Sequence, residues 1–239
     1  MRCLSVLVLL FLISPATAYA LLPPEPVEYT CPIDGTKFSQ MERVSDRTTD
    51  TMLDLQPVSA YGLSYPWPVP QCPNDGMLFF YGQNFTEKEV EVLKEYLATP
   101  EYRKMIDEDT TYWRIAKLRE RLGLSLNERW FAMLQATWQT SGVKYDDYAT
   151  EAIKAIETLL ADPPKEKKER DLETWSLLLG ELYRRIGDFD KARAIFEDLM
   201  IQPIYKNHDF YPQVIAYQLE LIGKKDKSSH AISDIKKSE

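Results

Sequence analysis

The chain has 239 residues, a formal net charge of −8 at pH 7, and three cysteines, Cys3, Cys31 and Cys72. An acidic chain is a poor candidate for binding a phosphate backbone, which depends on clustered Lys and Arg side chains. The composition therefore argues against a nucleic-acid partner.

Residues 1–20 have the order of a secretory signal peptide. Arg2 precedes an apolar run from Leu4 to Ile13, and small residues suitable for cleavage follow at Ala18 and Ala20. The apolar run is much shorter than the roughly 20 residues that a transmembrane helix needs. We therefore expect an exported protein that is cleaved after Ala18 or Ala20 and has no transmembrane segment in the mature chain.

The region before residue 84 has no helical period. Three prolines predict an extended spacer over residues 21–28. Residues 29–83, which contain Cys31 and Cys72, are expected to form a small domain of short strands and turns. Residues 52–55 are predicted to be one of its strands.

From Asn84 onward the sequence predicts helices. Thr86 and Glu89 form a capping box ahead of apolar residues at helical spacing, and Ser125 and Glu128 form another. Beyond the helix that Thr86 opens, the predicted helices cover residues 111–122, 125–142, 146–161, 172–186, 189–200 and 210–222. The Lys- and Ser-rich residues 224–239 are expected to be a disordered tail. The fold class is therefore mainly α, with a helical domain over residues 84–223.

One predicted helix pair, 172–186 with 189–200, resembles the tetratricopeptide repeat. Gly180 and Ala192 would let the two helices approach, while Tyr183 and Phe196 would fill the space between them. We therefore expect antiparallel helical hairpins whose concave groove binds a protein or peptide partner.

By analogy with tetratricopeptide proteins, a particular set of residues would line this groove: Thr174, Leu177, Glu181, Arg184 and Arg185. The two arginines could bind a carboxylate of the partner in bidentate fashion. The alternative is that both are ordinary arginines on a solvated surface.

The pattern C-P-x-D-G occurs twice, at residues 31–35 and 72–76. Together with residues 29–38, 68–76 and 84–86 and the helices that follow, it resembles a bacterial family, the domain of unknown function 2225. Members of that family carry two C-P-x-C-G zinc knuckles followed by tetratricopeptide-like helices. The resemblance implies a degenerate zinc-ribbon-like domain over residues 29–83 and, for an exported bacterial protein, a periplasmic location.

The chain departs from the family pattern at the second cysteine of each knuckle, which is Asp34 or Asp75 here. The family's four thiolates would hold zinc tetrahedrally, and only two remain. If the knuckles face each other as in the family, Cys31 and Cys72 can form a disulfide, worth about 4 kcal/mol for a loop of about 40 residues.

Two other arrangements of the knuckles remain open. Zinc could be held by Cys31, Asp34, Cys72 and Asp75, or the two thiols could be free. Asp-Gly is also a common turn pair, so both aspartates could be turn residues.

Catalytic motifs are missing from the sequence. It contains only two histidines, His208 and His230, and no G-x-S-x-G, phosphate-binding glycine loop or H-E-x-x-H pattern. We therefore expect no catalytic residues and no cofactor, and we favour a binding or scaffold module. The alternative is a metal-binding or enzymatic protein centred on the knuckles.

Overall fold

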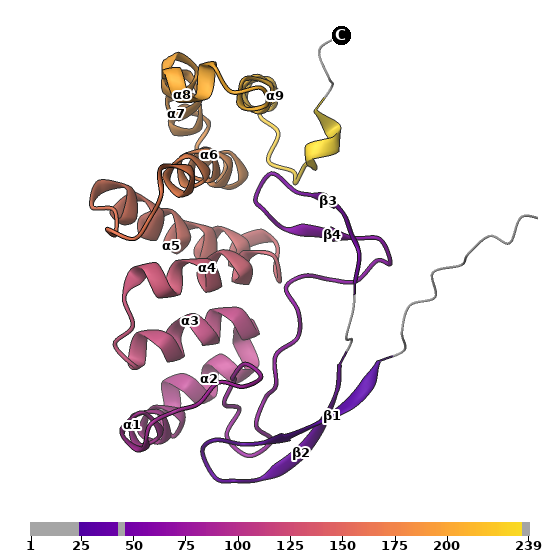
Figure 1. The fold of residues 1–239 in the computed structure, drawn as a ribbon, viewed down its shortest axis with the longest axis vertical. Helices are drawn as coiled ribbons and strands as arrows, with labels where there is room; N and C mark the ends of the chain where they lie inside the picture. Colours follow the sequence, from indigo (N-terminus) through magenta and orange to yellow (C-terminus); the bar gives the residue numbers. More distant parts are fainter. Residues whose placement is uncertain (1–23, 43–45, 236–239) are drawn as a thin grey trace, which may run out of the picture.

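The computed structural model describes residues 24–42 and 46–235, so the predicted signal peptide at residues 1–20 lies outside the described residues. Short strands come first: β1 (Glu25–Thr30), β2 (Lys37–Glu42), β3 (Thr48–Thr51) and β4 (Pro57–Ser59). The helices follow: α1 (Glu87–Leu97), α2 (Pro100–Glu108), α3 (Thr111–Arg121), α4 (Leu126–Thr137), α5 (Gly142–Ala161), α6 (Glu169–Ile186), α7 (Phe189–Ile201), α8 (Pro203–Lys206) and α9 (Tyr211–Gly223). A 3-10 turn spans Ile232–Asp234. The predicted fold class, mainly helical after a region of strands and turns, is confirmed (Figure 1).

Capping signals place most helix starts correctly. The predicted box at α1 is formed, with the Thr86 N–H donating to the Glu89 carboxylate at 2.8 Å. Several helix assignments differ from the prediction, and the short helix α8 was not predicted. The sequence missed α2, which begins at Pro100 after the N-cap Thr99. The helix expected to continue to residue 142 ends at Thr137, and α5, expected from residue 146, begins at Gly142.

Consecutive helices from α3 to α7 each pack on the next, which gives the stack in Figure 1. The predicted close approach within the α6–α7 hairpin is present. A Cβ atom on Gly180 would lie 2.5 Å from Cζ of Phe196, closer than any real side chain allows. The hairpin therefore depends on a residue without a side chain at position 180, whereas its assignment to the tetratricopeptide class stays a prediction.

We expect Gly180→Ala to lower the free energy of unfolding by about 1–3 kcal/mol, because the new methyl group overlaps the Phe196 ring. This loss should exceed the gain of up to about 1 kcal/mol that alanine normally brings to a helix. Gly223→Ala is a matched control, since its Cβ atom would meet nothing within 4 Å. Urea unfolding measures both variants, and equal effects would contradict the proposed packing.

The strands form two separate antiparallel pairs, β1 with β2 and β3 with β4. Two expectations for this region are corrected. The spacer predicted over residues 21–28 overlaps β1, where Pro26 is tolerated because β1 lies at a sheet edge. The strand predicted over residues 52–55 is displaced, since β3 ends at Thr51 and Leu55 turns the chain with a φ of 69°.

The region over residues 29–83 and the helices share one hydrophobic core. Cys72 and Met77 belong to the same buried cluster as Leu93 of α1, Tyr102 of α2 and Ile115 of α3. The predicted knuckle domain therefore packs directly on the helical domain, and the residues of both regions form one continuous buried cluster. None of the helices in the described ranges combines the length and hydropathy needed to cross a bilayer.

The tail predicted to be disordered over residues 224–239 is ordered as far as Ile235. Leu53 donates its N–H to the carbonyl of His230 at 2.8 Å, and Met52 bridges to Ala231. Ile235 is buried in a small cluster with Leu53 of the β3–β4 turn. The prediction of disorder was based on the many Lys and Ser residues of this segment and gave too little weight to apolar residues such as Ile235.

Candidate functional site

The two C-P-x-D-G segments fold into the same turn. In the first knuckle, Cys31 donates its N–H to Thr36 and Gly35 donates to Cys31, at 2.8 and 2.9 Å. The second knuckle repeats both bonds, from Cys72 to Met77 and from Gly76 to Cys72. Both glycines have a positive φ, 74° and 75°, which explains why glycine ends each motif.

The aspartates of both knuckles act as turn residues. Asp34 accepts the N–H of Thr36 and Asp75 accepts the N–H of Met77, each at 2.9 Å. Their surroundings differ, because a hydrogen bond from Asn74 lowers the pKa of Asp34, whereas burial raises the pKa of Asp75. The turn alternative for the two aspartates is therefore confirmed.

A disulfide joins the two knuckles. Cys31 and Cys72 are bonded and buried, with their Cα atoms 5.5 Å apart. Asp75 offers a carboxylate oxygen close to both sulfur atoms, but Asp34 turns its carboxylate to Asn74, at 2.7 Å. With both sulfurs in a disulfide and Asp34 directed elsewhere, the four residues of the zinc alternative do not fit a zinc ion.

The predicted groove residues of α6 are not free to bind a partner. Glu181 and Arg184 are both 0% exposed, and Arg184 Nη2 lies 2.7 Å from Glu181 Oε1. The guanidinium also donates to the side chain of Gln218 and to the carbonyls of Asp226 and Ser228. The expectation that Glu181 and Arg184 line an open groove is corrected, since α9 and the C-terminal segment cover them.

The third charged residue of this predicted groove, Arg185, does bind a carboxylate, but one from its own chain. Its Nη1 lies 3.1 Å from Oδ2 of Asp54, which is itself buried. Burial raises the pKa of Asp54 and the neighbouring Arg185 opposes that rise. Figure 1 shows the turn after β3 lying beside α6 and the C-terminal segment.

The remaining groove residues contribute little to this cluster. Thr174 donates its hydroxyl to the carbonyl of Arg170, one helical turn earlier. Leu177 is partly buried and packs against the hydrophobic core. The structure thus brings together Glu181, Arg184 and Arg185 as predicted, but as an internal cluster.

Helices α2 and α3, which lie toward the opposite end of the stack from α6, also contact the region before α1. Tyr102 of α2 donates its hydroxyl to the carbonyl of Gly76 at 2.9 Å, and Arg114 of α3 donates to the same carbonyl. Tyr112 donates to the carbonyl of Trp67 at 3.0 Å. Sequence reasoning missed Arg114, although its position one turn before the apolar Leu118 could have marked it as buried.

No protein-family model, curated protein or solved structure matches the chain. The resemblance to the domain of unknown function 2225 family therefore stays a prediction, carried by the two knuckles and the helices after them.

The two histidines do not form a hydrolytic site. His208 accepts the N–H of Tyr211 through Nδ1, as a residue that caps the start of a helix would. Ser228 and Asp226 both lie at Nε2 of His230, at 3.1 and 3.0 Å. The Ser228 hydroxyl donates to Asp226, and Tyr217 lies closer to Nδ1 of His230, at 3.0 Å, than Asp234 does, at 3.6 Å. The serine is therefore not hydrogen-bonded to the imidazole as the nucleophile of a catalytic triad is.

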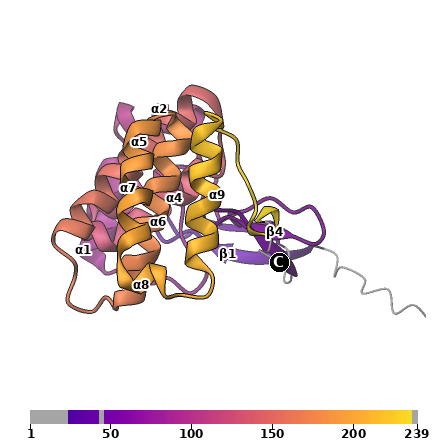
Figure 2. The same ribbon diagram turned by 90° about the horizontal axis from the view of Figure 1, so that it is seen from above.

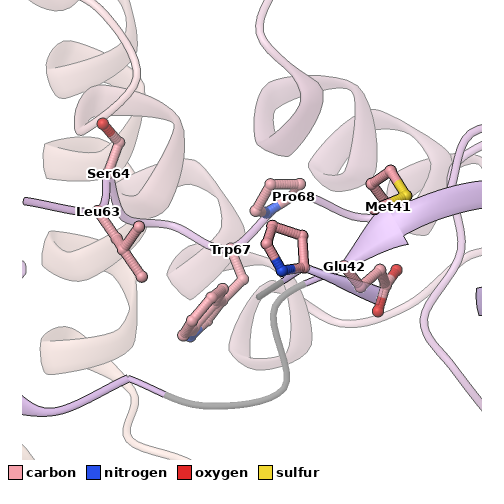
Figure 3. A pocket seen from close by; sticks show the side chains of 7 residues that line it. Met41, Glu42, Leu63, Ser64, Trp67 and Pro68 are labelled. Carbon is pink, nitrogen blue, oxygen red and sulfur yellow. The ribbon is translucent and has the colours of Figure 1, made fainter. Parts of the chain in front are cut away.

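A pocket of about 400 Å³ lies between the end of β2 and the chain over residues 63–68 (Figure 3). This volume is within the range of small ligand sites, which are largely apolar with a few polar groups. Its described lining is Pro24, Met41, Glu42, Leu63, Ser64, Trp67 and Pro68. The indole of Trp67 forms part of this wall.

Proposed function

We propose that this chain is an exported, non-catalytic binding module that holds a segment of a protein partner in the pocket between β2 and residues 63–68. The observation that carries the proposal is the apolar lining of this pocket, with Met41 59% exposed at its edge. Large exposed apolar side chains beside a pocket are typical of interaction sites. The predicted face of α6 is not available for this role, because Asp54 and the C-terminal segment occupy it.

The walls of the pocket are fixed by contacts within the chain. Gln40 of β2 donates its side-chain amide to the carbonyl of Val69 at 3.3 Å, which ties the strand to the opposite wall. Gln56 donates to the carbonyl of Tyr65 at 3.0 Å. The ring of Tyr65 packs edge-on against Trp67, 5.4 Å between centroids. A site whose shape is already set loses less entropy when a partner binds.

Export is supported by two independent features. The first twenty residues follow the signal-peptide pattern, and the two cysteines of the remaining chain are paired. Disulfides persist in oxidising compartments such as the bacterial periplasm. Sequencing the N-terminus of the protein from the periplasmic fraction should give a chain that begins at Tyr19 or Leu21, whereas an intact Met1 would contradict export.

Site-specific photo-crosslinking in the exporting cell tests the binding surface. With a photoreactive phenylalanine at Met41, we expect one discrete crosslinked product, because a partner in the pocket would touch this side chain. Val143 of α5 is the matched control, since it is apolar and even more exposed, at 79%, but does not line the pocket. Equal crosslinking at both positions, or none at Met41, would contradict the proposal.

A further inference from the structure

We propose that the partner places an arginine or lysine side chain in this pocket, with its cationic end at the Glu42 carboxylate. This inference rests on the proposed function and adds the chemistry of the partner segment. Glu42 lines the pocket together with Pro24. Figure 3 shows its side chain beside that of Met41.

The Glu42 carboxylate has no cationic partner within the described residues. Its Oε1 atom is buried, and the hydrogen-bond donor beside the carboxylate is the neutral hydroxyl of Tyr29. Within residues 24–42 and 46–235 no Lys or Arg nitrogen lies within 4 Å of this carboxylate, although such pairs occur elsewhere in the chain. Burial raises the pKa of Tyr29, and its hydrogen bond to the Glu42 carboxylate raises that pKa further. A partly buried carboxylate whose only donor is a neutral hydroxyl is costly, and a cationic donor would stabilise it more strongly.

A second carboxylate lies across the sheet from Glu42. The β1–β2 register places Glu25 directly opposite Glu42. Like charges in directly opposed positions destabilise a strand pair, and a bound cation would relieve that repulsion. The net charge of −8 also attracts a basic partner at long range.

The apolar walls indicate a long side chain as the carrier of this cation. Lys and Arg have methylene stems that pack along apolar surfaces such as those of Pro68 and Met41. The indole ring of Trp67 can attract the same cation through its face. A bare metal ion would make no apolar contacts with these walls, whereas a basic side chain on an extended segment would pack against them.

Peptide titrations followed by NMR test the inference on the exported full chain. The probes are acetyl-Leu-Arg-Leu-amide and the same peptide with citrulline, which is neutral and nearly isosteric with arginine. We expect the arginine peptide to shift the Trp67 indole signal and to bind about tenfold more tightly than the citrulline peptide. Glu42→Gln should remove this preference. Glu28→Gln, at an exposed carboxylate of β1 opposite Ser39, should keep it.

The alternative outcomes separate the two proposals. Equal affinity for the arginine and citrulline peptides would overturn the cationic partner, while leaving the binding pocket in place. If neither peptide shifts Trp67 and Met41 gives no crosslink, the proposed function itself fails. If acetyl-arginine-amide binds as tightly as the peptide, the occupant is a small amine and a peptide partner is overturned.

Discussion

Replacing Arg184 with methionine should lower the free energy of unfolding by about 3–5 kcal/mol, because it breaks a buried ion pair by removing one partner. Glu181 and Arg184 are both fully buried, and Arg184 makes two hydrogen bonds from Nη2 to the Glu181 carboxylate, at 2.7 and 2.8 Å. Methionine leaves the carboxylate with Gln218, which donates at 2.8 Å but carries no charge, and with the more distant Arg185, 4.0 Å away. Urea unfolding at neutral pH measures the loss.

The loss should depend on pH in a defined direction. Burial raises the pKa of Glu181, and Arg184 opposes that rise, so the variant should have a folded-state pKa even further above 4.5. A folded-state pKa above the unfolded value contributes stability that is present below the unfolded pKa and is lost as pH rises through the folded pKa. The difference between variant and wild type should therefore be smallest at acid pH and grow toward neutral pH.

Arg193→Met is the matched control for this change. Arg193 forms an exposed pair with Glu197 within α7, 3.8 Å apart, and such surface pairs contribute about 0–1 kcal/mol. Arg184 also binds the carbonyls of Asp226 and Ser228, so its loss should speed amide hydrogen exchange in residues 224–230. If both arginine variants lower the free energy of unfolding equally, the buried ion pair contributes no more to stability than an exposed one.

Helices could be predicted where their signals are local. The Thr86 capping box and the Gly180–Phe196 packing both depend on residues at short spacing, and both are present. Helix α2 was missed because it is short and mostly charged, with only Tyr102 and Met105 buried. Its place is set by contact with the knuckle region, which no local pattern reports.

The groove prediction identified residues that do lie together, but not what covers them. Glu181 and Arg184 are three positions apart, the spacing of an ordinary surface pair on a helix. Their burial depends on Asp54 and on the segment after α9, which are distant in sequence. By contrast, the resemblance of the two knuckles to the zinc-knuckle family implied that Cys31 and Cys72 could face each other, and the structure bonds them.

The double substitution Cys31→Ala/Cys72→Ala should lower the free energy of unfolding by about 4 kcal/mol. The disulfide joins residues 41 positions apart, so it removes a large loop from the freedom of the unfolded chain. Alanine is preferable to serine, because both positions are buried and an unpaired hydroxyl would add a cost of its own. The slope of the urea transition should also rise, because the unfolded variant is less compact.

The folded variant should keep the architecture of both knuckles. Each turn has its own backbone hydrogen bonds, and the second is also held by Tyr102 and Arg114 through the carbonyl of Gly76. The effect of the disulfide should therefore appear in stability and in the unfolded state more than in the folded structure. Circular dichroism of the variant below its transition checks this point.

Wild type unfolded and refolded with reductant is the internal control, since it lacks the bond but keeps both sulfur atoms. It should gain the mass of two hydrogens and unfold at about the same urea concentration as the double alanine variant. Because Cys31 and Cys72 are buried, reduction should require opening of the structure and be slow in the native state. If wild type gains the two hydrogens but loses no stability, then the turns and the contacts of Gly76 with α2 and α3 hold the knuckles together, and the disulfide does not.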